Sequence, residues 1–171
     1  MYCSHLRVPK HDVGQARPFK TFRNNTRLQA AMWVGNEPAL IERVRAARPA
    51  PKGLIPQRLL EFDRQLDFSA THIVSLRDER VVGAMRLVEN DRVGTQLREH
   101  GPYGIAPFDA LTFQQGIVEV GRAWVDAHER GSGLFVHMIR KAAEFGIARG
   151  CRFLVLSAGQ HLSLLYARIG C

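Results

Sequence analysis

The sequence predicts an α/β domain built on a mixed sheet, and three observations support this prediction. Residues 37–47 place apolar side chains at helical spacing, residues 70–88 alternate like two strands joined by a tight turn, and residues 116–150 read as a strand, a glycine-containing loop and a long helix. Helical and strand-like stretches alternate along most of the chain. This order is typical of a sheet with helices on its faces.

The length and composition fit one folded domain. The chain has 171 residues, of which 46% are hydrophobic, and this is enough to form a core. No apolar run approaches the roughly 18 residues of a membrane span, and the first residues lack the apolar stretch of a secretory signal. The cysteines Cys3, Cys151 and Cys171 are odd in number and have no C-x-x-C spacing, so we expect reduced thiols, no metal site and a cytoplasmic location.

The positive charge is concentrated at the front of the chain. The formal net charge is +8, and residues 1–60 hold 11 Lys and Arg against 3 Asp and Glu, whereas residues 61–171 hold 13 of each. A localised basic surface suits an acidic protein, a nucleic-acid backbone or an anionic membrane, and a solvated arm explains it equally well. Nucleic-acid binding is disfavoured, because aromatic residues are sparse in this region and no nucleic-acid motif is present.

The elements begin after an irregular start. Residues 1–30 combine scattered charges and prolines without periodicity, so we predict a flexible basic arm before a domain of residues 31–171. Residues 37–47 are predicted to form an amphipathic helix, which nearby prolines and a glycine end. A second short helix is expected at residues 56–62.

A β-hairpin is predicted at residues 70–88. β-Branched residues lie on both sides of the charged run 77–80, which supplies the turn. Residues 89–115 then form a long connection rich in Gly, Pro and polar residues. Loops of this length often serve as lids or binding segments, so a substrate-side loop and a merely mobile loop both remain open.

The second half is expected to hold a central strand, a long helix, a further strand and a last helix. Residues 116–125 form the central strand, and the long helix ends near Gly150. Residues 152–157 read as a short buried strand, and residues 160–169 as a helix whose apolar side chains share one face.

The loop between the central strand and the long helix has the properties of a phosphate-binding site. The first amides of a helix have no partner within the helix, and the helix dipole adds partial positive charge there. Gly131 and Gly133 allow close backbone approach, and Arg130 adds a full charge. The spacing matches neither G-x-x-x-x-G-K-[ST] nor G-x-G-x-x-G, so a Walker loop and a dinucleotide fingerprint are both excluded.

This loop resembles the acyl-donor loop of the GNAT superfamily of N-acyltransferases, R/Q-x-x-G-x-G/A. The resemblance implies a mostly antiparallel sheet and a donor that carries pantetheine, with its pyrophosphate or phosphate held by the loop residues Arg130, Gly131, Ser132, Gly133, Leu134 and Phe135. Phe135 stands where the family usually has a small residue. This departure favours phosphopantetheine on an acyl carrier protein over free coenzyme A.

Further motifs resemble one branch of that superfamily. The stretches 61–67, 70–74, 82–88 and 119–122 are similar to E-x-D-x-x-D, A-x-H, V-G-x-x-R-L and E-x-x-R, the pattern of acyl-homoserine-lactone synthases and long-chain N-acyl amino acid synthases. The similarity to this branch covers roughly residues 40–171.

The end of the chain also resembles the family. Residues 165–170 are similar to the L-Y-x-x-x-G that closes the family's last helix, after which family domains continue for another strand pair. The resemblance therefore implies that this sheet lacks the final strands, with truncation as the expected reason.

Glu119 is the candidate general base. It lies in an apolar strand, where an unpaired charge is costly, and the alternative is a structural ion pair with Arg122. The two residues are three positions apart, so only a bulge, for which Gly121 is suited, would bring them to one face. By resemblance, this bulge splays the strand from its neighbour, and main-chain groups near Trp124 and Val125 bind the pantetheine arm.

Three other side chains complete the predicted site. By resemblance Tyr166 is the proton donor to the departing thiolate, and the alternative is a core tyrosine. Arg86 and Arg122 could bind an acceptor carboxylate, and the alternative is a salt bridge to Glu61, Asp63 or Asp67.

These observations together predict an N-acyltransferase. We expect it to move an acyl group from acyl-CoA or an acylated carrier protein to the amine of an amino acid or similar small metabolite, without a metal. The alternatives are acetyl transfer from acetyl-CoA and a catalytically silent binding module.

Overall fold

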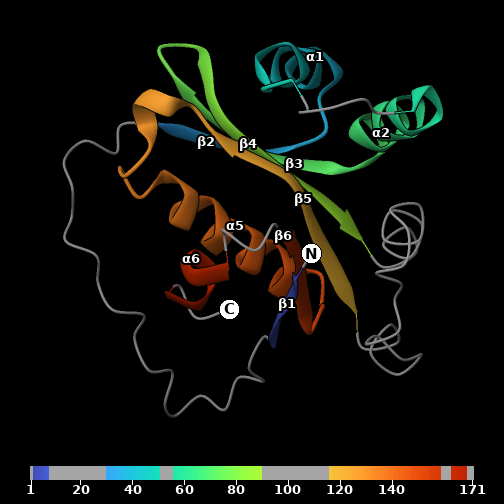
Figure 1. The fold of residues 1–171 in the computed structure, drawn as a ribbon, viewed down its shortest axis with the longest axis vertical. Helices are drawn as coiled ribbons and strands as arrows, with labels where there is room; N and C mark the ends of the chain where they lie inside the picture. The colour runs from blue at the N-terminus through green and yellow to red at the C-terminus, as the bar shows by residue number, and fades with distance from the viewer. Residues whose placement is uncertain (1, 8–29, 51–55, 90–115, 159–162, 169–171) are drawn as a thin grey trace.

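A six-stranded sheet forms the centre of the molecule (Figure 1). The computed structural model describes residues 2–7, 30–50, 56–89, 116–158 and 163–168. The strand order is β1-β6-β5-β4-β3-β2, and every neighbouring pair is antiparallel except β5 and β6, which are parallel. The predicted mixed, mostly antiparallel sheet with flanking helices is therefore confirmed.

The elements follow one another in a simple order. They are β1 (Tyr2–Arg7), β2 (Ala31–Gly35), α1 (Pro38–Ala47), α2 (Gln57–Ser69), β3 (Thr71–Arg77), β4 (Arg80–Glu89), β5 (Ile117–Val125), the 3-10 turn η1 (Ala127–Glu129), α5 (Leu134–Ala148), β6 (Phe153–Ala158) and α6 (Ser163–Arg168). Helices α1 and α2 lie on one face of the sheet, and α5 and α6 lie on the other (Figure 1).

The core has two parts because helices cover both faces. Met85 and Leu87 of β4 point toward α5 and pack with Leu134 and Met138, whereas Ala84 points toward α1 and packs with Val44. Strand β4 is buried along almost its whole length, as expected for a strand covered on both faces.

Most predicted elements are present. The helix at 37–47, the strands at 116–125 and 152–157 and the last helix all appear within a few residues of their expected bounds. The hairpin is also confirmed, and its turn places Asp78 and Glu79 at φ of 47° and 63°, the left-handed backbone that tight hairpin turns need. The second helix, α2, is longer than expected and runs to Ser69.

The structure adds two strands that the sequence did not predict. Residues 2–7, expected to be irregular, form β1 and pair antiparallel with β6 from Tyr2–Ala158 to Arg7–Phe153. Strand β2 pairs with β3 at the opposite edge of the sheet. Both edge strands are short and mix polar with apolar residues, so pairing with a neighbour rather than their own periodicity defines them.

Several predictions lie outside the described residues. They are the rest of the predicted basic arm, almost all of the long 89–115 connection, and the end of the chain, where the final strands were expected to be missing. The division into an arm and a domain stays a prediction.

Candidate active site

A β-bulge interrupts the pairing of β4 with β5. Ala84 pairs with Trp124 and Arg86 pairs with Gly121, so Met85 faces both Arg122 and Ala123. Arg122 has a φ of 51°, which is strained for a residue with a side chain. The predicted bulge is therefore present, with the strained backbone at Arg122 rather than at the expected Gly121.

Strands β5 and β6 separate close to this bulge. β5 pairs with β6 from Ile117 to Val120, whereas residues 157 and 158 of β6 pair with β1 alone. Within the described part of the chain, the last residues of β5 therefore have a strand partner on one side only. Trp124 and Val125, the predicted main-chain contacts for the donor, lie in this stretch and pair with Ala84 and Gly83 of β4.

Glu119 is fully buried just before the bulge. It faces Val88 on β4 and Val155 on β6, so apolar side chains flank it on both neighbouring strands. No donor among the described residues forms a hydrogen bond with either of its carboxylate oxygens. Burial raises its pKa from 4.5 to about 7, an effect that the charge of Arg86 partly opposes.

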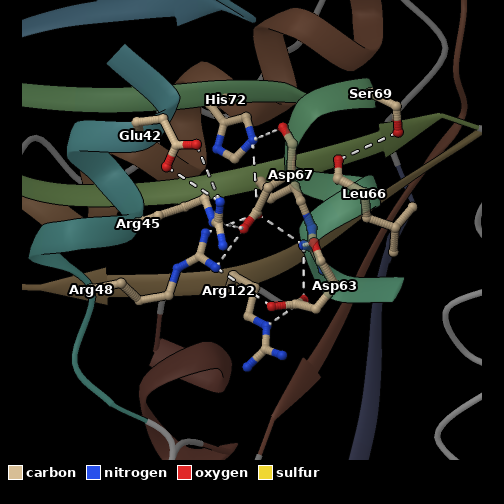
Figure 2. A network of polar contacts seen from close by, with 10 residues as sticks. Glu42, Arg45, Arg48, Asp63, Leu66, Asp67, Ser69, His72 and Arg122 are labelled. Atoms are coloured by element: carbon tan, nitrogen blue, oxygen red, sulfur yellow. Dashed lines mark hydrogen bonds and ion pairs between the residues drawn. The ribbon is translucent and has the colours of Figure 1, made fainter. Parts of the chain in front are cut away.

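The ion pair considered between Glu119 and Arg122 does not form. The Nε of Arg122 donates instead to Oδ1 of Asp63 on α2, at 2.8 Å (Figure 2). The role of Glu119 as the general base stays a prediction. The alternative role, a structural ion pair with Arg122, is not observed.

A cluster of buried and partly buried charged side chains lies between α1, α2 and the sheet, and we call it the Asp63/Asp67 cluster (Figure 2). Its members are Asp63, Asp67, Arg48, Arg86 and Arg122. Arg86 donates through Nη1 to Oδ1 of Asp63 and Oδ1 of Asp67, both at 2.9 Å, and to the main-chain oxygen of Asp63 at 3.1 Å. Arg48 binds both oxygens of Asp67 at 2.9 Å.

Histidine His72 closes the cluster on the β3 side. It is fully buried, and its Nε2 lies 2.8 Å from the main-chain oxygen of Asp67, so Nε2 carries the proton and donates it. Burial lowers the pKa of His72. The histidine is therefore neutral and packed against the cluster.

The two arginines predicted to bind an acceptor carboxylate differ in accessibility. The Arg86 side chain is 1% exposed and forms salt bridges with Asp63 and Asp67, which was the alternative interpretation. The Arg122 side chain is 28% exposed, and its terminal nitrogens point away from Asp63 in Figure 2. Arg122 therefore has the geometry to contact a ligand as well as Asp63, and both predicted roles remain untested.

The predicted phosphate loop joins η1 to α5. Gly131 and Gly133 have φ of 79° and 88°, values that favour glycine, and Gly133 caps the helix. Ser132 Oγ accepts the amide of Leu134 at 3.2 Å, whereas no acceptor in the described segments binds the amides of Gly131, Gly133 or Phe135. The loop thus presents donors at a helix N-terminus, as anion binding requires.

Side chains around this loop are either exposed or part of the core. Arg130 is exposed beside the glycines, and Leu134 is buried in the core on the α5 side. Phe135 packs against the same core, and its ring lies 5.9 Å from that of Tyr166, measured between centroids, at 56°. Tyr166 on α6 is 4% exposed. Tyr166, the predicted proton donor, therefore lies beside the predicted acyl-donor loop.

An ion pair that the sequence did not indicate anchors the loop. Arg77 at the end of β3 contacts both oxygens of Glu129, at 2.8 and 2.9 Å. Asp126 caps η1 by accepting the amide of His128, and the Asp126 amide donates to Val82 of β4. Arg77 and Glu129 are 52 positions apart in the sequence, and Arg48 and Asp67 are 19 apart. Neither pair could therefore be found from the periodicity of a single helix or strand.

Two further observations concern metal binding and membrane spans in the described segments. No group of three or more His, Cys, Asp or Glu residues there could hold a metal ion. None of the helices found in them is long and apolar enough to cross a membrane.

Comparisons with known proteins identify the family of this chain. The acetyltransferase (GNAT) domain family matches residues 47–140, more than half of the chain. No curated protein matches the chain.

Solved structures share the fold at low sequence identity. An acetyltransferase from Trypanosoma brucei is 16% identical, with a TM-score of 0.52 over 83% of this chain and 92% of that one. An acyl-CoA N-acyltransferase from Pseudomonas aeruginosa is 18% identical, with a TM-score of 0.56 over 82% and 87%. An aminoglycoside N-acetyltransferase solved in complex with CoA is 13% identical, with a TM-score of 0.56 over 82% and 88%.

Proposed function

Because this chain belongs to the GNAT acetyltransferase family, we propose that it is an N-acyltransferase in which Glu119 removes the proton from the acceptor amine. The observation that carries this assignment is the buried carboxylate of Glu119, which has no hydrogen-bond partner among the described residues and lies beside the point where β5 and β6 separate. A general base works best when its pKa is close to the working pH, and burial brings the pKa of Glu119 to about 7.

The donor is proposed to be a pantetheine thioester whose phosphate lies on the loop before α5. The amides of Gly131, Gly133 and Phe135, which have no acceptor in the described segments, would bind phosphate oxygens, and the exposed Arg130 would add a charge-assisted contact. The pantetheine arm would lie along the main chain at Trp124 and Val125, where β5 has no partner on its β6 side within the described residues.

Within this reaction we propose a long-chain acyl group on an acidic carrier protein as the donor. The excess positive charge in residues 1–60 suits an acidic partner. Phe135 replaces a small residue on the loop, and its ring packs on Tyr166. Acetyl-CoA is the second candidate, supported by the acetyltransferase family match and by the CoA complex of the structurally similar aminoglycoside N-acetyltransferase.

The acceptor is proposed to be an amino acid or a similar amine with a carboxylate. Arg122 is part-exposed, and its terminal nitrogens point away from Asp63, so they can form a forked contact with a carboxylate (Figure 2). Arg122 follows Glu119 by three positions on β5, across the bulge, so one acceptor could present its carboxylate to Arg122 and its amine to Glu119.

The proposed reaction has three steps. Glu119 takes a proton from the ammonium group, and the free amine attacks the thioester carbonyl to form a C–N bond. The nitrogen of the tetrahedral intermediate then loses a second proton to solvent, the C–S bond breaks, and the phenol of Tyr166 protonates the departing thiolate. Glu119 and Tyr166 exchange their protons with solvent before the next turnover.

Mass spectrometry of reaction mixtures tests this proposal. The protein is incubated with acetyl-CoA, a long-chain acyl-CoA or a long-chain acyl carrier protein, together with a pool of amino acids. A new N-acyl amino acid, formed about 10²- to 10⁴-fold more slowly by Glu119→Gln, is the expected result. Formation of only N-acetyl products would select acetyl-CoA, and equal rates for the variant and the unaltered protein would remove Glu119 from the mechanism.

A further inference from the structure

We propose that Asp63 and Asp67 are positioning residues for Glu119, because they bind the guanidinium group of Arg86 and so keep it from forming an ion pair with Glu119 on the neighbouring strand. The inference rests on the proposed role of Glu119 as the base. It assigns a purpose to two aspartates and a buried arginine that the reaction itself does not use.

The strand register places Arg86 within reach of Glu119. Glu119 pairs with Val88, and Arg86 lies two residues before Val88, so Arg86 and Glu119 share one face of the sheet as diagonal neighbours. Such neighbours are about 7–8 Å apart at their backbones, which a long side chain can span. An arginine beside a buried carboxylate would ordinarily bind it.

Arg86 binds the aspartates of α2 instead. Its Nη1 contacts Oδ1 of Asp63 and Oδ1 of Asp67 at 2.9 Å each, while no hydrogen bond from the described residues reaches Glu119. Asp67 is itself held by both terminal nitrogens of Arg48. The guanidinium group of Arg86 is therefore bound by two carboxylates of α2.

The other charged groups on this face of the sheet come from each element that packs on it. They are Glu42, Arg45 and Arg48 from α1, Asp63 and Asp67 from α2, Arg86 from β4 and Arg122 from β5, with neutral His72 on β3 and apolar Val155 on β6. These described groups comprise four arginines and three carboxylates. The loss of either aspartate charge leaves the region more positive and weakens the hold on Arg86.

A released Arg86 would change the behaviour of Glu119. An opposite charge within about 4–6 Å favours the ionised form of a carboxylate and lowers its pKa by about 1 to 3. Since the base must be deprotonated to act, a lower pKa moves the acid side of the pH–rate profile to lower pH. At pH values above the acid limb, the reaction rate falls as well, because a weaker base removes the proton less readily.

The experiment measures kcat/KM for the amine against pH in Asp63→Asn and Asp67→Asn, and follows the carboxyl carbon of Glu119 by ¹³C NMR. Both substitutions keep the side-chain shape. The matched control is Glu42→Gln, which removes the same charge from an exposed carboxylate that pairs with Arg45 and does not contact Arg86. Arg86→Gln removes the competing cation and is expected to move the limb in the opposite direction.

The expected result is an acid limb about 1 or more pH units lower in the two aspartate variants, higher in Arg86→Gln and unchanged in Glu42→Gln. If Asp67→Asn does not fold, Asp63→Asn and Arg86→Gln still decide the question. An unchanged Glu119 titration in these two variants, or an equal change in Glu42→Gln, overturns the inference.

The NMR measurement separates this inference from the proposed function. A Glu119 resonance that titrates as expected in a protein without acyltransferase activity would support the positioning role and contradict the proposed reaction. An acid limb that disappears in Glu119→Gln but keeps its position in Asp63→Asn and Arg86→Gln would support the reaction and overturn the positioning role.

Discussion

At the scale of single residues, Glu119 has consequences for stability as well as for chemistry. Its pKa is about 7 in the folded protein, against an ordinary value of 4.5. The folded state therefore binds a proton at Glu119 that the unfolded state has released between these values. Stability that is present below pH 4.5 is lost as the pH rises to about 7.

We predict that Glu119→Gln removes this pH-dependent loss of stability. The glutamine cannot ionise, so the variant should gain stability over the unaltered protein as the pH rises from about 4.5 to 7, by a difference on the order of 3 kcal/mol. Urea unfolding at several pH values measures it. A constant difference between the two proteins across this range would show that Glu119 is not buried as a titrating group.

Tyr166 gives a second prediction at this scale. Removing the hydroxyl in Tyr166→Phe keeps the ring that packs on Phe135, so folding should be preserved. The loss of general-acid assistance is expected to reduce kcat by about 10²-fold or more, with little change in KM for the donor. Steady-state kinetics and a thermal melt test it. Unchanged kcat would leave Tyr166 with a packing role only.

At the residue scale, a charge within an apolar strand could be recognised from the sequence. Glu119 was identified because its neighbours along β5 are apolar, and it is fully buried. The ion pair considered between Glu119 and Arg122 is absent, because the partner of Arg122 is Asp63, 59 positions away on α2. A local sequence pattern predicts on which face of the strand a side chain lies. It does not predict which distant element packs against that face.

At the scale of elements, a salt bridge joins β3 to η1, directly before the predicted acyl-donor loop. Arg77 clamps Glu129, which comes directly before Arg130 and the two loop glycines. The glycines give the loop conformational freedom, so this pair and the cap by Asp126 restrict it.

We predict that Arg77→Gln raises KM for the acyl donor several-fold and changes kcat little, because it loosens the loop without touching the reacting groups. The matched control is Arg80→Gln on the same hairpin, whose side chain is 78% exposed and lies 3.9 Å from Asp126. Glu129→Gln should give the same effect as Arg77→Gln, and the double variant should add little to it. Additive effects would mean that the pair does not act as a unit.

The elements also mark how far the sequence could predict the fold. Strands β3 to β6 and helices α1, α5 and α6 followed from apolar periodicity and turn residues. The edge strands β1 and β2 did not, because pairing with β6 and β3 defines them and their own sequences carry little pattern. The bulge was expected from the family resemblance, with Gly121 as a suitable residue, but its strained residue is Arg122, which no propensity favours at positive φ.

At the scale of the whole molecule, the residues of the proposed reaction lie on opposite faces of the sheet. The Asp63/Asp67 cluster and the side chain of Glu119 lie on the face covered by α1 and α2. The core side chains under α5, Phe135 and Tyr166 lie on the other face. Donor and acceptor would therefore approach from opposite faces and meet where β5 and β6 separate, an arrangement that depends on long-range packing and could not be derived from local patterns.

The distribution of charge over the chain gives the last prediction. If the excess of Lys and Arg in residues 1–60 steers an acidic carrier protein, association should weaken as salt screens it. We expect kcat/KM for an acyl carrier protein to fall about tenfold or more between low and high salt. The neutral thioester acyl-pantetheine, with the same acyl group, is the control and should show little change. An equal salt response for both donors would assign the basic segment another role and would favour the CoA thioester as the donor.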